Sequence, residues 1–142
     1  MTGVDPRSSV RGARLLCVDD NEFGLYVNTV ILRSEGYDVT ACSDVAEAKA
    51  VAVLQDIDLA IVDYQMPLMN GVELAAFCKA ANPEMKVIIF SGHFDIPKRE
   101  LALADLFVSK SDGIQALLEA IAALLQRSRE PANFASSLPT GA

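Results

Sequence analysis

Five short apolar runs alternate along this chain with segments of helical character, and this alternation limits the folds that it can adopt. The apolar runs are Arg14–Val18, Tyr37–Ala41, Leu59–Val62, Lys86–Phe90 and Leu106–Val108. Runs that are apolar at successive positions are typical of strands buried on both faces. Strands that alternate with helices pair in parallel, because each helix returns the chain to the same edge of the sheet. The sequence therefore predicts an α/β fold, a doubly wound five-stranded parallel sheet with helices on both faces.

The segments between these runs carry the signals that begin and end helices. The predicted helices are Glu22–Glu35, a segment from Ser43 or Asp44 to about Gln55, Val72–Ala81, Pro97–Ala104 and a last helix that Asp112 caps. In the first of them, apolar side chains recur at helical spacing, and the stripe that they form is Phe23, Val27, Val30 and Ile31.

Length and composition indicate the domain organisation. A chain of 142 residues is about one domain long, and 51% apolar with 22% charged residues is typical of a folded protein. We expect a flexible segment over residues 1–13, one domain over residues 14–127 and a disordered tail over residues 128–142, where prolines and serines occur without periodicity. This tail is too short to bury a core of its own, so no output domain is expected there.

Charge and hydropathy exclude several classes of protein. Twelve basic against nineteen acidic residues leave a net charge of −7, which argues against direct nucleic acid binding. Because no apolar run approaches the ~18–20 residues of a membrane span, and the first residues do not resemble a signal peptide, we expect a cytoplasmic protein without membrane contact. The three cysteines, Cys17, Cys42 and Cys78, are interpreted as reduced residues of the core.

Polar side chains of chemical interest follow the strands where they end. Asp19 and Asp20 follow the first predicted strand, Asp63 the third, Ser91 the fourth and Lys110 the fifth. In an open parallel sheet, ligands bind beyond the carboxyl ends of the strands. Clustered carboxylates repel one another unless a cation lies among them, and oxygen ligands suit Mg²⁺. A lysine and a serine beside them predict a site for Mg²⁺ and a phosphoryl group.

Each of these residues also has a purely structural interpretation. Asp19 and Asp20 could cap the helix that follows them, since aspartate is a favoured N-cap. Asp63 could be a solvated loop residue, Ser91 part of a turn and Lys110 an ordinary surface lysine. Their joint placement at strand ends favours the site.

Four fragments of the sequence resemble the receiver domain of two-component response regulators. They are VDDN at Val18–Asn21, DYQMPLMNG at Asp63–Gly71, FSG at Phe90–Gly92 and FVSK at Phe107–Lys110. The fragments occur in the family's order, and the resemblance covers roughly residues 14–127. It implies the flavodoxin-like fold of CheY-like receivers.

The resemblance implies a phosphoacceptor and a metal site. Asp63 would take a phosphoryl group from a sensor histidine kinase or a phosphotransfer protein. Asp20 would bind Mg²⁺ directly and Asp19 through water, with Asp63 and the backbone carbonyl of Gln65 completing the protein ligands.

It also implies residues that bind the phosphoryl group and respond to it. Lys110 would pair with this group and Ser91 would move to donate a hydrogen bond to it. Phe107 would occupy the aromatic switch position, whose side chain turns inward when Ser91 moves. Gln65 and His93 would border the group and tune its hydrolysis rate.

Three functions follow as alternatives. The first is a single-domain receiver that switches its binding surface for a downstream protein partner when phosphorylated. The second is a receiver fragment of a larger regulator. The third is a small Mg²⁺-dependent phosphohydrolase with Asp63 as nucleophile. Gln65 disfavours this enzyme, because it stands where such an enzyme needs an acid to protonate the leaving group. We therefore predict a signalling domain rather than an enzyme.

Overall fold

A single parallel sheet organises the molecule. The computed structural model describes Val10, residues 12–92 and residues 95–129, without the side chains of residues 128 and 129. The sheet has the order β2-β1-β3-β4-β5. Its strands are β1 (Arg14–Val18), β2 (Asp38–Cys42), β3 (Leu59–Val62), β4 (Lys86–Ser91) and β5 (Leu106–Ser109), all paired in parallel. The predicted fold class is confirmed, and each strand end lies within one residue of its predicted position.

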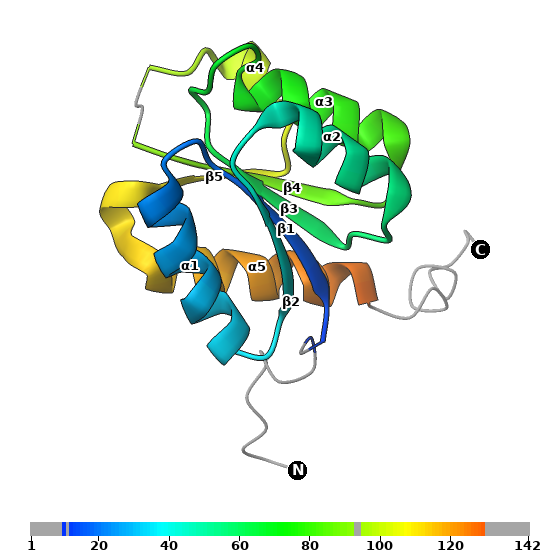
Figure 1. Cartoon of the computed structure of the whole chain (residues 1–142), viewed down its shortest axis with the longest axis vertical. Helices are drawn as coiled ribbons and strands as arrows, with labels where there is room; N and C mark the ends of the chain where they lie inside the picture. The colour runs from blue at the N-terminus through cyan, green and yellow to red at the C-terminus, as the bar shows by residue number, and fades with distance from the viewer. Residues whose placement is uncertain (1–9, 11, 93–94, 130–142) are drawn as a thin grey trace, which may run out of the picture.

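Helices cover both faces of this sheet (Figure 1). They are α1 (Glu22–Ser34), α2 (Val45–Leu54), α3 (Gly71–Ala81), α4 (Lys98–Leu101) and α5 (Gly113–Arg129). Helices α1 and α5 lie on one face, and α2, α3 and α4 lie on the other, with one hydrophobic cluster between each layer and the sheet. None of the helices in the described part of the chain has the length and apolar character needed to span a lipid bilayer.

Helix α1 packs on the sheet through only part of the apolar stripe seen in the sequence, since Ile31 packs against the core cluster. Its buried residues are Leu25, Thr29 and Leu32, whereas Phe23 is 77% exposed and Val30 is 47% exposed. The helix carries two sets of side chains with the same spacing, and spacing alone does not tell which one packs on the sheet. The second stripe (Phe23, Tyr26, Val27 and Val30) is left as an exposed apolar face of α1.

Two ends of the predicted domain lie further out in the structure. Val10 and Ala13 belong to the core, with 0% and 1% exposure, so the folded domain begins before Arg14. Helix α5 continues to Arg129, because extending a helix by one residue costs little once its earlier turns are formed. The remainder of the two predicted terminal segments lies outside the described residues.

Helix α4 is shorter than the predicted Pro97–Ala104. Beyond Leu101 the amides of Leu103 and Ala104 donate to carbonyls three residues back, at 3.0 and 3.1 Å, so the turns tighten and the α-helix ends. None of the four residues of α4 is buried, and no side chain caps its first turn. This helix is therefore held by few interactions.

Candidate functional site

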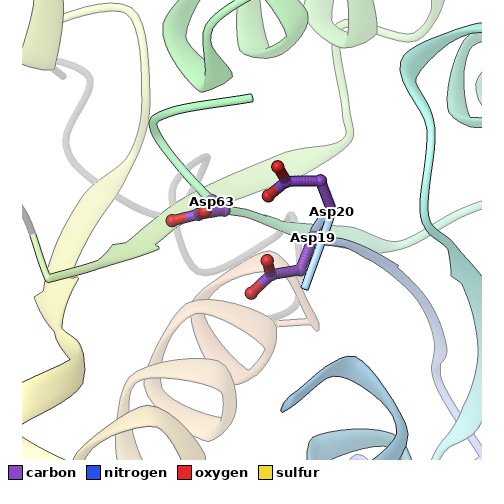
Figure 2. Close-up of side chains that lie close together, drawn as sticks. All are labelled: Asp19, Asp20 and Asp63. Atoms are coloured by element: carbon purple, nitrogen blue, oxygen red, sulfur yellow. The ribbon is translucent and has the colours of Figure 1, made fainter. Parts of the chain in front are cut away.

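The carboxylates predicted to form the site lie at the point where the strand order reverses. The chain passes from β1 outward to β2 and then returns to β3 on the other side of β1, which leaves a crevice beyond the ends of β1 and β3. The Asp63 amide donates to the Val18 carbonyl at 3.0 Å, which continues the pairing of β3 with β1. Asp19, Asp20 and Asp63 are brought together here, with one carboxylate oxygen of each within 4.8 Å of the others (Figure 2).

Lys110 directly follows β5 and reaches this cluster from the carboxyl end of that strand. Its Nζ lies 2.8 Å from Asp19 Oδ2 and 3.6 Å from Asp63 Oδ1. Burial alone would lower the pKa of Lys110, but the hydrogen bond to Asp19 and the charges of Asp19 and Asp63 raise it above its ordinary value. The lysine is therefore a permanent positive charge between two carboxylates.

Asp19 and Asp20 differ although they are neighbours in the chain. Asp19 is buried, and it engages both of its oxygens: Oδ1 accepts from the Asn21 amide at 2.9 Å and Oδ2 from Lys110. Asp20 is exposed. The alternative capping role belongs instead to Asn21, whose side chain accepts from the Gly24 amide at the start of α1. The two aspartates are thus not needed to cap the helix.

Asp63 lies among charged groups and is largely shielded from solvent. Its side chain is 14% exposed, and its Oδ1 accepts from the Tyr64 amide at 3.0 Å. Burial and the negative charge of Asp19 raise the pKa of Asp63, against the opposing effects of Lys110, the Tyr64 amide and a hydrogen bond from Ser91. Ser91 itself is buried at the end of β4, with 1% exposure. Asp63 therefore interacts directly with two other predicted site residues, Lys110 and Ser91.

Two backbone contacts behind Asp63 were not predicted. The Gly71 amide donates to the Tyr64 carbonyl at 2.6 Å, so the start of α3 lies against the segment that carries the phosphoacceptor candidate. A Cβ on Gly71 would lie 2.2 Å from the Asp63 carbonyl oxygen. The sequence did hold a signal for this placement, because Asn70 and Glu73 form a capping box that makes Gly71 the first helical residue.

The remaining predicted residues lie around this centre. Phe107 is half-buried and packs against the hydrophobic cluster under α2 and α3. Gln65 is exposed in the loop after β3. His93 lies outside the described residues. The metal and rate-tuning roles of Gln65 and His93 therefore stay predictions.

The three carboxylates fit a magnesium ion by the chemistry of their donors. They offer hard oxygen ligands from two adjacent strand ends, and magnesium retains waters where protein ligands are few. The raised pKa of Asp63 indicates that its ionised form is disfavoured by its surroundings without a cation. A divalent ion would remove this penalty.

We expect Asp63→Asn to stabilise the metal-free protein. When folding raises the pKa of an acid, the folded protein loses stability as the pH rises from the ordinary pKa, here 3.8, through the raised pKa. At neutral pH the full loss is present. Chemical denaturation in a chelator should give the variant about 1 kcal/mol more free energy of unfolding at neutral pH. This gain should vanish below the ordinary pKa. Asp56→Asn, at an exposed position near the opposite edge of the sheet, is the control and should show no gain.

A family model and a similar protein of known name both indicate the same family for this chain. Residues 15–122 match the family model described as the response regulator receiver domain. The chain is 35% identical over 123 residues to the transcriptional regulatory protein GlrR of Escherichia coli K12, a match that covers 84% of this chain and 28% of GlrR. The chain therefore spans less than a third of the length of this relative.

Solved structures of TrrA from Thermotoga maritima resemble this one. TrrA in complex with Mg²⁺-BeF has a TM-score of 0.74 at 26% identity, covering 79% of this chain and 98% of TrrA. TrrA in complex with the histidine kinase ThkA has a TM-score of 0.73 at 27% identity, covering 80% and 98%.

Proposed function

This chain belongs to the response regulator receiver family, and from that premise we propose that it accepts a phosphoryl group on Asp63 with the help of Mg²⁺. Receiver domains are signalling domains that typically bind Mg²⁺ in an acidic pocket. The observation that carries the proposal is Lys110 Nζ at 2.8 Å from Asp19 and 3.6 Å from Asp63, within a cluster of three carboxylates.

The phosphoryl transfer that we propose needs no reactant besides the donor and Asp63. The donor is a phosphohistidine: an oxygen of the Asp63 carboxylate bonds to phosphorus, and the bond from phosphorus to the imidazole nitrogen breaks with its electron pair on nitrogen. Phosphoryl transfer asks a protein mainly for positioning and for neutralisation of charge. Lys110 supplies one positive charge next to Asp63, and Ser91 supplies a hydroxyl donor beside it.

Asp20, Asp63 and Asp19 are the side chains that we propose as the Mg²⁺ site, with the Gln65 carbonyl. Magnesium, when bound, would neutralise the carboxylates and the phosphoryl oxygens. Because both oxygens of Asp19 already accept hydrogen bonds, this residue is better suited to hold a metal-bound water than to bind the ion directly. The exposed Asp20 suits direct coordination.

The exposed apolar face of α1 supports a protein as the phosphoryl donor. It begins at Phe23, four residues after Asp19, so it adjoins the site. A donor that presents a histidine to Asp63 would cover this face, and burying it would contribute to affinity through the hydrophobic effect. TrrA, a similar protein, has been solved in complex with a histidine kinase. We propose a sensor histidine kinase or a phosphotransfer protein as partner.

The phosphorylated domain would pass its signal to another protein or to another domain, in one of two arrangements. In the first, this domain acts alone and its phosphorylated form binds a downstream protein. In the second, it is the receiver of a longer regulator, an arrangement supported by the length of GlrR. Both arrangements require the same chemistry at Asp63.

Intact-mass measurement tests the proposed function. We expect wild-type protein with Mg²⁺ and acetyl phosphate to gain the mass of one phosphoryl group, and to gain none when a chelator replaces Mg²⁺. Asp63→Asn should gain none under either condition, whereas the control Asp56→Asn should behave as wild type. A phosphoryl adduct on Asp63→Asn would overturn the assignment. Rapid multiple turnover of phosphate esters would favour the phosphohydrolase instead.

A further inference from the structure

Tyr64 connects the phosphoacceptor candidate with α4. Its amide donates to Asp63 Oδ1 at 3.0 Å, and its hydroxyl donates to Glu100 Oε1 at 2.9 Å. Glu100 lies 36 residues further along the chain, in the four-residue helix α4. One residue therefore contacts both the reacting carboxylate and a helix on the outer layer.

We propose that Tyr64 is a positioning residue, and that its hydrogen bond to Glu100 stabilises the unmodified state of Asp63 relative to the phosphorylated state. The inference rests on the proposed function and adds to it a named route from Asp63 to α4. Neither Tyr64 nor Glu100 was singled out by the sequence.

The backbone of Tyr64 is held tightly enough to transmit a change at Asp63. Its carbonyl accepts from Gly71 at 2.6 Å, so both sides of the residue are fixed by hydrogen bonds. Phosphorylation turns the ionised Asp63 carboxylate into a mixed anhydride. The carboxylate oxygen then loses its charge, and a hydrogen bond to a charged acceptor is about twice as strong as one to a neutral acceptor. The Tyr64 amide is thereby released in part.

Helix α4 is suited to respond to this release. None of its four residues is buried, and no side chain caps it. Leu101 is half-buried against the same hydrophobic cluster as Tyr64. The Glu100 carboxylate also raises the pKa of Tyr64, through the hydrogen bond between them. The hydrogen bond from Tyr64 to the charged Glu100 carboxylate is thus one of the contacts that hold this small helix.

Coupling between two sites is reciprocal, so removal of the hydrogen bond should change binding at Asp63. We expect Tyr64→Phe to bind beryllofluoride with Mg²⁺ at least about fivefold more tightly than wild type, since the unmodified state loses its stabilisation. Glu100→Gln keeps an acceptor oxygen without its charge and should give a smaller gain. Tyr37→Phe removes the same hydroxyl from a tyrosine that directly precedes β2, at the opposite edge of the sheet from Asp63, and serves as the matched control, with no expected change.

The double variant Tyr64→Phe with Glu100→Ala separates coupling from a general structural effect. We expect it to bind beryllofluoride no more tightly than Tyr64→Phe alone, and α4 amides of Tyr64→Phe to exchange hydrogen faster before ligand is added. Unchanged or weaker binding by Tyr64→Phe, while wild type binds and Asp63→Asn does not, overturns this inference and leaves the proposed function intact. Absence of binding by wild type overturns both.

Discussion

Replacing Lys110 by alanine should slow phosphorylation of Asp63 by about a hundredfold, the usual cost of removing one preorganised group that stabilises transition-state charge. The lysine is the cation nearest to the acceptor among the described residues, 3.6 Å from Asp63 Oδ1, and Asp19 holds it there at 2.8 Å. The measurement is the rate of mass gain with acetyl phosphate and saturating Mg²⁺.

Lys86→Ala is the control for this change. Lys86 begins β4, so it lies at the opposite edge of the sheet from the carboxylates, and its removal should leave the rate within about twofold. Lys110→Arg keeps the charge but not the compact ammonium group, and we expect it to recover only part of the rate. If Lys110→Ala reacted as fast as wild type, the role given to this lysine would be wrong.

Gly71→Ala should destabilise the fold by about 3 kcal/mol and distort the site as well. The added Cβ would lie 2.2 Å from the Asp63 carbonyl oxygen and 3.0 Å from Tyr64 Cα. These are backbone atoms that cannot rotate away, so α3 must move from the end of β3. We expect a lower midpoint in urea unfolding and, in the fraction that remains folded, slower phosphorylation.

Gly24→Ala is the matched control, and we expect it to raise the stability of the fold rather than lower it. Gly24 lies in α1, and its added Cβ would meet nothing nearer than the Asn21 side chain at 3.6 Å, an ordinary contact. Alanine in a helix is more favourable than glycine by roughly 0.5–1 kcal/mol. Wild-type stability in Gly71→Ala would contradict the close approach of α3 to Asp63.

The parts of the site that could be predicted are those that follow from topology. Once the strands are parallel, their carboxyl ends meet at one edge, so Asp19, Asp63 and Lys110 converge although up to 91 positions separate them. Their chemical character then indicates a cation and a phosphoryl group. No knowledge of side-chain packing is needed for this step.

Features that depend on three-dimensional packing could not be predicted. The two apolar stripes of α1 have the same spacing, and only the position of the helix on the sheet selects Leu25 and Leu32 as the buried pair. The hydrogen bond from Tyr64 to Glu100 joins the loop after β3 to a helix 36 positions further along the chain, and it depends on where the short α4 lies.

The most direct test of the central claim is to locate the phosphoryl group chemically. Borohydride reduces an aspartyl phosphate to homoserine, which mass spectrometry of peptides identifies at a single position. Wild-type protein treated with acetyl phosphate and Mg²⁺ should carry homoserine at position 63, and no homoserine should form when Mg²⁺ is chelated. Homoserine at Asp19 or Asp20, or its absence from a protein that has gained the phosphoryl mass, would contradict the assignment of Asp63 as phosphoacceptor.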